Sequence, residues 1–285
     1  MNARLARGLA WAAALALLVA ALQLTAEVGP VARMFAVVGA LLVGMKTVVI
    51  VEWTTQTRAT LPLARGLAFT LAWPGMRPGD FAERSREAHV LSAWPGWRAL
   101  ALGAALVAAA RVALPRSSAL AYGLALPGFS LILHFGFFRL LAAFWRARGF
   151  AVAPPFDAPL LSTSLGEFWS RRWNRAFSDM TALVVYRPVS RWLGTTPGLV
   201  AAFVFSGVLH ELAISVPARG GYGGPLAYFV LHAVLVAVER VLQSRGRFNW
   251  PAAWSRAWTA LWLVLPVPIL FHRPFLDGVV RPLLG

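Results

Sequence analysis

Long apolar runs separated by short polar segments recur along most of this chain. A transmembrane helix needs about 20 mostly apolar residues to cross the hydrocarbon core of a bilayer. Seven runs meet or nearly meet this length: Leu9–Leu24, Met34–Val51, Leu100–Leu114, Ala119–Leu141, Pro197–Pro217, Pro225–Leu242 and Trp254–Phe271. A shorter run over residues 61–73, of only about 13 residues, predicts an interfacial or re-entrant piece. The pattern therefore predicts an all-α, polytopic transmembrane helical bundle with about seven to eight spans plus interfacial or re-entrant helices.

The composition supports lipid as the main solvent of the chain. Of the 285 residues, 59% are apolar and 13% are charged, whereas soluble domains are about half apolar and a quarter charged. The formal net charge of +16 is compatible with nucleic-acid binding, but the basic residues are spread between apolar runs instead of clustering, so we expect no nucleic-acid partner. The absence of cysteine excludes disulfides, thiol nucleophiles and thiolate metal sites.

Arginines gather in alternate polar segments, and this bias predicts the orientation. With a cytoplasmic N-terminus, the inner side holds Arg4, Arg7 and the arginines of segments 58–98, 139–191 and 240–256. The outer side holds fewer: Arg33, Arg116, Arg219, Arg273 and Arg281. This matches the positive-inside rule for a multi-pass protein. Arg4 and Arg7 before an apolar run are also compatible with a secretory signal peptide, but the later spans favour a retained first helix.

Two long non-spanning stretches, Glu52–Arg98 and Trp145–Thr196, fall on the predicted cytoplasmic side, where a membrane enzyme would admit a soluble substrate. The second contains Ser164 and Glu167, whose spacing predicts a helix-starting capping box. On a continuous helix through residue 178, one face is aromatic and the other polar, which predicts an amphipathic interfacial helix. The aromatic face comprises Leu165, Phe168, Trp169, Trp173 and Phe177, and the polar face Glu167, Arg171, Asn174 and Ser178.

Arg172 departs from this pattern because it projects into the predicted aromatic face. An unpaired guanidinium is costly there, so we expect it to reach phospholipid headgroups, to stack on Trp169 or to meet an anion. Headgroup contact is the simpler interpretation. The alternative is a contact with the phosphates of a nucleotide-bearing substrate, which the fork geometry of guanidinium suits.

The fifth predicted span contains the ionisable pair His210 and Glu211. A rise of about 1.5 Å per residue places His210 roughly 20 Å from Pro197, beyond the midplane. Ser206 and Gly207 each lie one turn earlier, and Gly207 would let a neighbouring helix or a substrate approach closely. Ionisable residues at this depth indicate function, although a His that only hydrogen-bonds a neighbouring helix is the alternative. The five histidines show no paired ligand spacing, so we predict no metal site.

The run from Ser164 to Asn174 (S-L-G-E-F-W-S-R-R-W-N), followed by Ser206–Glu211 (S-G-V-L-H-E), resembles the membrane-bound O-acyltransferases. Within that family the chain is most similar to the plant-type wax synthase branch. The flanking segments Phe69–Met76 and Leu270–Phe275 are also similar to that branch. The resemblance covers roughly residues 65–285, and it implies a single membrane-embedded acyltransferase domain over residues 1–285.

The resemblance implies transfer of a long-chain fatty acyl group from acyl-CoA, as co-substrate and without a cofactor, to the hydroxyl of a lipid alcohol. That alcohol would be a fatty alcohol, giving a wax ester, or a sterol-like alcohol. The histidine of the S-G-x-x-H-E motif, taken as the catalytic base, is His210, and the asparagine of the R-W-N motif is Asn174. This chemistry fits the residues. An alcohol is a poor nucleophile until a base removes its proton, and histidine is suited to act as that base near neutral pH. Candidate substrate-binding residues are Arg172, Trp169, Trp173, Ser206 and Glu211.

Glu211 points about 100° away from His210 on an ideal helix, so we expect it to pair with another helix and not to act as a triad acid. Two other functions fit the same residues. One is a lipid or proton-coupled transporter with His210 and Glu211 as a relay, although no inverted repeat or pair of broken helices is visible. The other is an O-acyltransferase that acts on a polysaccharide or protein acceptor.

Overall fold

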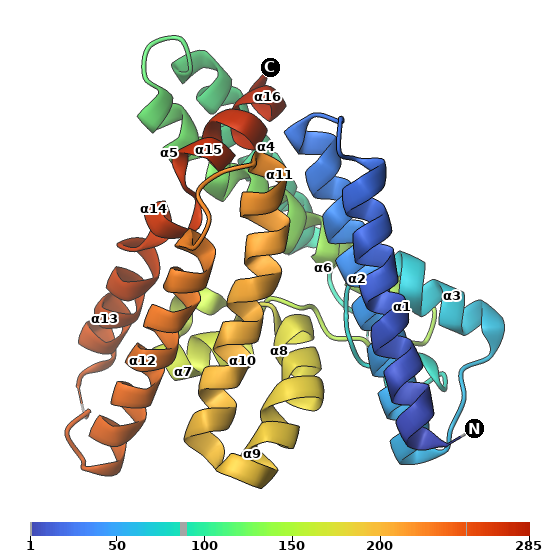
Figure 1. The fold of residues 1–285 in the computed structure, drawn as a ribbon. Coiled ribbons are helices and arrows are strands. Elements are labelled where there is room, and N and C mark those ends of the chain that lie inside the picture. The colour runs from blue at the N-terminus through green and yellow to red at the C-terminus, as the bar shows by residue number, and fades with distance from the viewer. Residues whose placement is uncertain (1, 86–89, 249) are drawn as a thin grey trace. The chain divides into compact units, whose positions relative to one another are not determined.

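The computed structural model describes residues 2–85, 90–248 and 250–285, and its regular elements there are all helical (Figure 1). Within this part of the chain, seven helical segments are long and apolar enough to cross a membrane: α1 (Ala3–Leu24), α2 (Pro30–Thr57), α4 (Trp94–Ala113), α5 to α6 (Ser118–Ala147), α10 to α11 (Thr195–Ala218), α12 (Gly224–Ser244) and α13 to α14 (Ala252–Leu270). They coincide with the seven predicted runs. The prediction of an all-α, polytopic helical protein is therefore confirmed.

The remaining elements are short. They are α3 (Leu63–Ala72), η1 (Pro78–Phe81), η3 (Pro159–Leu161), α7 (Leu165–Glu167), η4 (Phe168–Arg172), α8 (Arg175–Thr181), η5 (Ala182–Tyr186), α9 (Arg187–Leu193), α15 (Arg273–Phe275), η7 (Leu276–Val280) and α16 (Arg281–Leu284). Helix α3 confirms the helical character of the apolar run at 61–73, and its interfacial or re-entrant placement stays a prediction.

Contacts divide the chain into two compact units. The first comprises Met1–Leu15, Leu42–Pro155 and Leu276–Gly285, and the second comprises Ala16–Leu41 and Phe156–Phe275. Both sequence motifs fall in the second unit. The description of residues 1–285 as one acyltransferase domain stays a prediction.

Small residues let the long helices of the first unit approach one another closely. A Cβ on Gly44 of α2 would lie 2.9 Å from the Cβ of Ala14 on α1. A Cβ on Gly103 of α4 would lie 2.7 Å from the carbonyl oxygen of Gly128 on α5. Helices inside lipid gain packing energy through such close backbone approach. These glycines therefore fix how the helices of this unit pack.

Lys46, inside the second span, is completely buried in the first unit. Its Nζ donates to the carbonyl oxygens of Phe69, at 3.0 Å, and Gly75, and it lies 3.5 Å from the centroid of the Phe69 ring. An ammonium group inside a span needs such oxygen and ring partners. Lys46 thus anchors the segment from α3 to Gly75 against α2.

In the second unit, a series of short helical pieces from α7 to α9 leads into α10 (Thr195–His210), which packs beside α12 (Figure 1). Helix α10 continues through η6 (Glu211–Ser215) and α11 (Val216–Ala218). Both η4 and η6 are π-helical turns, in which the N–H of Trp173 and that of Val216 donate to carbonyls five residues earlier. Such turns occur frequently at functional sites, but the described chain also has them outside the two motifs, at η2 (Leu131–Phe137), η5 and η7.

Candidate active site

His210 ends the α-helical part of α10 and is half-buried. Its Nδ1 lies 2.7 Å from the carbonyl oxygen of Ser206. A carbonyl can only accept, so the Nδ1–H donates and the proton of the neutral imidazole sits on Nδ1. The Nε2 lone pair then remains an acceptor, and no hydrogen bond from the described residues reaches it. The local geometry leaves His210 with a free basic nitrogen.

Two aromatic rings hold the imidazole in place. The Phe229 ring, from α12, lies with its centroid 4.3 Å from that of His210 at an interplanar angle of 40°. The Phe177 ring, from α8, lies 5.9 Å away in an edge-on arrangement. Apolar walls of this kind exclude water from the ring. The sequence placed Phe177 on an aromatic helix face and did not mark Phe229, and neither contact with His210 was predicted, because both depend on how the helices pack.

The two sequence motifs meet at α12. The Trp169 ring, from the first motif, lies 5.5 Å from the Phe229 ring, which also contacts His210 of the second motif. Trp169 further contacts Tyr228, with the centroids 6.5 Å apart, and His232, with the centroids 5.3 Å apart. The structure therefore brings Trp169 and His210 to opposite parts of one aromatic cluster.

Trp173 reaches that cluster through Phe168, whose ring lies 5.0 Å from that of Trp169. Its ring stacks on Phe168, with the centroids 5.4 Å apart, and meets the edge of Phe156 at 4.9 Å. Of the two tryptophans proposed as substrate contacts, Trp169 is thus near His210 through Phe229, whereas Trp173 packs within the preceding segment. Their roles in substrate binding stay predictions.

Ser206 is buried, and its hydroxyl donates to the carbonyl oxygen of Ala202 at 2.9 Å. The hydroxyl is therefore used within its own helix, and it is the backbone of Ser206 that contacts His210. Gly207 allows the close approach of a neighbouring helix that the sequence predicted. A Cβ there would lie 3.0 Å from the Cα of Leu226 on α12, so α10 and α12 touch nearly backbone to backbone at this point.

Glu211 pairs with a neighbouring helix, as predicted. Its Oε1 accepts the backbone N–H of Leu226, in the first turn of α12, at 3.1 Å. A carboxylate is favoured at a helix N-terminus, where backbone N–H groups lack partners within the helix. Glu211 therefore ties η6 to α12 and makes no hydrogen bond with His210 among the described contacts.

The continuous amphipathic helix predicted over residues 164–178 is wrong. The helix breaks at Trp173, which is extended, and at Asn174, which has a left-handed φ of 42°. The predicted start is right: the Glu167 N–H donates to Ser164 Oγ at 3.0 Å. In a capping box the Glu167 carboxylate would accept the backbone N–H of Ser164. Here it accepts the N–H of the preceding residue, Thr163, at 2.8 Å.

Of the partners expected for Arg172, the structure shows an anion from its own turn, the Glu167 carboxylate. Its Nε lies 2.6 Å from Glu167 Oε1, and it also donates to the carbonyls of Asp157 and Ala158 at 3.4 Å. Burial acts to raise the pKa of Glu167, but the hydrogen bonds from Thr163 and Arg172 outweigh it and hold that pKa below its ordinary value. Arg172 thus closes the η4 turn, and a phosphate contact through it stays a prediction.

Asn174 begins helix α8. Its Oδ1 accepts the Phe177 N–H at 3.2 Å, which makes it the N-cap of the helix that carries Phe177 to His210. Asparagine suits this place because it tolerates a left-handed backbone and caps helices well. Its Nδ2 makes no hydrogen bond to the described residues, so one amide donor pair remains available.

Glu239 on α12 is a site-supporting residue that sequence reasoning missed. It is only 1% exposed, and its carboxylate accepts the N–H of Leu165 at 2.9 Å, that of Gly166 at 3.0 Å and the indole N–H of Trp258 at 3.0 Å. These three bonds fix the start of the first motif against α12 and α13. An acid inside the sixth apolar run was the available signal.

His272, in the closing segment Leu270–Phe275, contacts the end of the second motif. Its Nδ1 accepts the Phe275 N–H at 3.3 Å, so Nε2 carries the proton and donates to Ser215 Oγ at 3.1 Å. Burial lowers the pKa of His272, which favours this neutral form. The closing segment is thereby held against η6. Among the residues that the structure describes, no group of three or more His, Asp or Glu side chains is arranged to hold a metal.

Comparison with known proteins places these residues in a family context. A model of the membrane bound O-acyl transferase family matches residues 152–231, which include both motifs. The chain is similar to a long-chain-alcohol O-fatty-acyltransferase of Simmondsia chinensis, with 38% identity over 104 residues (33% of this chain and 30% of that protein). It is also similar to two Arabidopsis thaliana proteins. One is a probable long-chain-alcohol O-fatty-acyltransferase 6, 32% identical over 139 residues (42% of this chain, 40% of the relative). The other is an acyl-CoA–sterol O-acyltransferase 1, 33% identical over 132 residues (40% and 38%).

These matches confirm the resemblance to the membrane-bound O-acyltransferases and to their wax synthase branch. The chain spans less than half the length of the curated relatives it matches, between 30% and 40% for these three. Together with the seven apolar helices, the family match supports a multi-pass membrane protein.

Proposed function

We propose that this chain is an acyl-CoA-dependent O-acyltransferase that moves a long-chain fatty acyl group to the hydroxyl of a lipid alcohol, with His210 as general base. The observation that carries the proposal is the tautomer of His210. Its Nδ1–H is held by the Ser206 carbonyl, which leaves the Nε2 lone pair without a partner among the described residues and ready to take a proton. The relatives named for long-chain alcohols and sterols support the substrate class.

In the proposed reaction, Nε2 of His210 removes the proton of the alcohol as its oxygen attacks the thioester carbonyl carbon. The C–O bond forms, the C–S bond breaks, and the departing thiolate takes the proton from Nε2. The products are the ester and free CoA, and the imidazole returns to its starting tautomer. The Ser206 carbonyl stabilises the imidazolium that forms transiently, since the Nδ1–H bond strengthens when the ring is charged.

The orientation of the substrates follows from the predicted topology. With a cytoplasmic N-terminus, the arginine-rich segment of residues 139–191 faces the cytoplasm, where the anionic head of acyl-CoA would dock. The alcohol would enter from the bilayer. In this proposal Glu211 has a structural part, because its carboxylate is engaged by the N–H of Leu226.

The decisive test is incubation of the purified protein with labelled acyl-CoA and separate long-chain alcohols or a sterol, followed by analysis of the lipid products. We expect labelled ester and stoichiometric free CoA. Transport of either substrate into vesicles without any ester would contradict the proposal and favour a transporter. Acyl transfer only to a sugar or protein acceptor would retain the chemistry but overturn the lipid-alcohol assignment.

The free Nδ2 of Asn174 leads to a prediction that separates chemistry from capping. Asn174→Asp keeps the oxygen that caps α8 and tolerates the same backbone, but it replaces the amide donor with a negative charge. If Nδ2 polarises the thioester carbonyl, kcat falls on the order of 10²-fold, as for the loss of one oxyanion donor. The melting temperature should stay near that of the wild type.

Ser164→Ala is the matched control, because it removes the N-cap of α7 without touching α8. It should cost about 1 kcal/mol of stability and leave kcat within about twofold. Wild-type turnover in Asn174→Asp would show that Asn174 acts only as a helix cap.

A further inference from the structure

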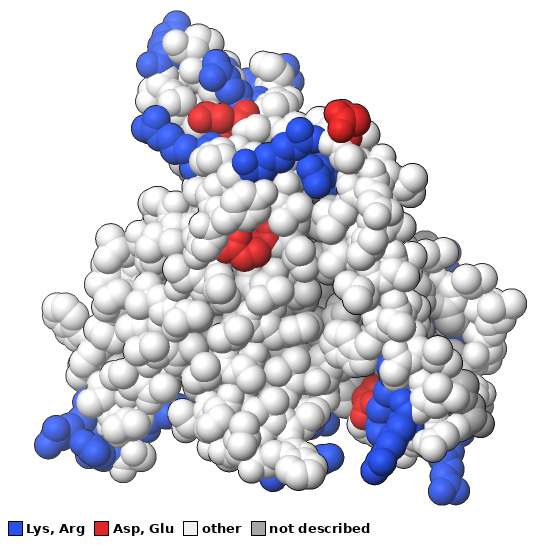
Figure 2. Space-filling model, viewed as in Figure 1, with Lys and Arg blue, Asp and Glu red and all other residues white. Residues whose placement is uncertain are grey.

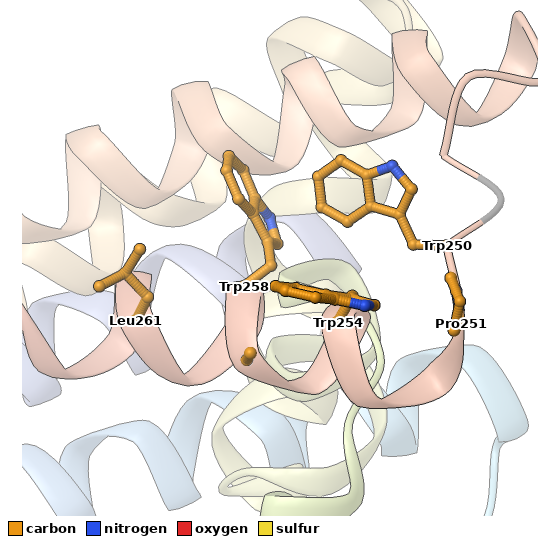
Figure 3. A pocket seen from close by; sticks show the side chains of 6 residues that line it. Trp250, Pro251, Trp254, Trp258 and Leu261 are labelled. Carbon is orange, nitrogen blue, oxygen red and sulfur yellow. The ribbon is translucent and has the colours of Figure 1, made fainter.

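A tryptophan-lined groove opens along the first turns of α13. It has a volume of about 590 Å³ and is lined by Trp250, Pro251, Trp254, Ala257, Trp258 and Leu261. Figure 3 shows the indoles of Trp250 and Trp258 near one another, with the ring of Trp254 lying below them. The side chains that line it are almost wholly apolar, so the groove suits an aliphatic chain.

Two of the tryptophans that line the groove are held in place by contacts within the protein. The Trp258 indole donates to the buried Glu239 carboxylate at 3.0 Å, and the Trp250 ring lies edge-on to Trp258 with centroids 5.6 Å apart. Phe248 stacks behind Trp250 at 4.7 Å. Tryptophans that only anchored the protein at the interface would not need to enclose a volume. A preformed site loses less side-chain entropy on binding.

Positive charge gathers beside the groove, where the chain turns from α12 to α13. Arg240, Arg245 and Arg247 are exposed, and no carboxylate of the described chain lies within ion-pair distance of them. Figure 2 shows blue side chains at the lower left, at the place of this turn in Figure 1. The turn itself is tight, because the Arg247 N–H donates to the Leu242 carbonyl at 2.8 Å.

We propose that this groove binds one anionic phospholipid, with an acyl chain along Trp254, Ala257 and Leu261 and the phosphate at Arg245 and Arg247. Guanidinium groups bind phosphate through paired hydrogen bonds, and basic clusters beside a span attract anionic lipids. A neutral alcohol would fill the groove but leave the arginines without a partner. Charge complementarity therefore favours the phospholipid over a neutral alcohol, and acyl-CoA, whose head is expected at residues 139–191, serves as a competitor in the test; the assignment does not rest on the proposed enzymatic activity.

The test is native mass spectrometry of the delipidated protein in detergent, titrated with palmitoyl-oleoyl phosphatidylglycerol or with the phosphatidylcholine of the same chains. We expect one tightly held phosphatidylglycerol with at least tenfold preference over phosphatidylcholine. Trp254→Ala should weaken its binding about fivefold or more. Trp254 is 70% exposed, so the variant should fold. Trp192→Ala is the matched control, because Trp192 is 89% exposed on α9 and lies outside the groove.

Further variants separate the two halves of the site. Ala257→Phe should block the groove and weaken both lipids, whereas joint replacement of Arg245 and Arg247 by Gln should abolish the preference for phosphatidylglycerol alone. Equal binding in Trp254→Ala and Trp192→Ala would overturn the proposal, as would equal affinity for the two lipids. Displacement of the lipid by acyl-CoA or hexadecanol at equimolar concentration would also overturn it, since the groove would then be a substrate site.

Discussion

His210→Ala is expected to lower ester formation about 10²- to 10⁴-fold, the range that a positioned general base contributes. The alcohol would then have to attack without losing its proton to the imidazole of His210. The acyl-CoA affinity should change little, since the anionic head is expected at the arginine-rich segment of residues 139–191. The measurement is kcat with labelled acyl-CoA and a long-chain alcohol, together with acyl-CoA binding to the same sample.

The matched control is His134→Ala. His134 lies in the fourth span, in the first unit, and its Nδ1 contacts the hydroxyl of Ser130 one turn earlier at 3.1 Å. The two variants remove the same side chain from the interior of a membrane-spanning segment. Only the His210 variant should lose turnover while both insert and melt normally. Near-normal turnover in His210→Ala would remove the base from the mechanism.

The spans could be predicted from the sequence because their signal is local. A helix in lipid satisfies its own backbone hydrogen bonds, so an apolar run of sufficient length is nearly enough to specify it. His210 could be singled out as a candidate for a similar reason, since an ionisable group inside such a run has few explanations, and its catalytic role stays a prediction. That Glu211 would face another helix and not His210 also followed from helical geometry, although its partner, the N–H of Leu226, did not.

The first motif shows where sequence reasoning fails. Residues five apart point about 140° apart on an α-helix, which separated Glu167 from Arg172 in the predicted pattern. In the structure η4 is a π-helical turn, whose i to i+5 bonding brings these two residues to the same side, where they pair at 2.6 Å. No periodicity predicts a π turn. Asn174 did carry a signal for the break, since asparagine tolerates a left-handed backbone.

Contacts between residues far apart in the chain could not be predicted from the sequence. Glu239 stands 74 residues from Leu165, whose N–H it accepts, and Phe229 reaches His210 only because α10 and α12 pack closely. An acid in the sixth span could have been marked as functional, but its partners depend on how three segments pack. Stabilising contacts of this kind require the tertiary structure.

Gly207→Val is expected to damage both stability and turnover, because Gly207 sets the distance between α10 and α12. A Cβ there would lie 2.7 Å from Leu226 Cδ1, 3.0 Å from Leu226 Cα and 3.4 Å from Phe229 Cβ. The Leu226 side chain can turn away, but its Cα can move only if α12 moves. Overpacking of this kind costs about 1–3 kcal/mol, which corresponds to a fall in melting temperature of about 3–10 °C.

The same displacement should reach His210, which lies one turn further along α10 and packs on Phe229 of α12. We therefore expect kcat to fall in the folded fraction as well, with Gly207→Ala intermediate between the wild type and Gly207→Val. Gly123→Val is the matched control: it lies on α5, and a Cβ there meets nothing within 4 Å. Both variants replace a helical glycine with valine, so the change in helix propensity is the same in the two and cancels when they are compared. Equal melting temperatures and turnover in the two variants would mean that the α10–α12 contact does not position His210.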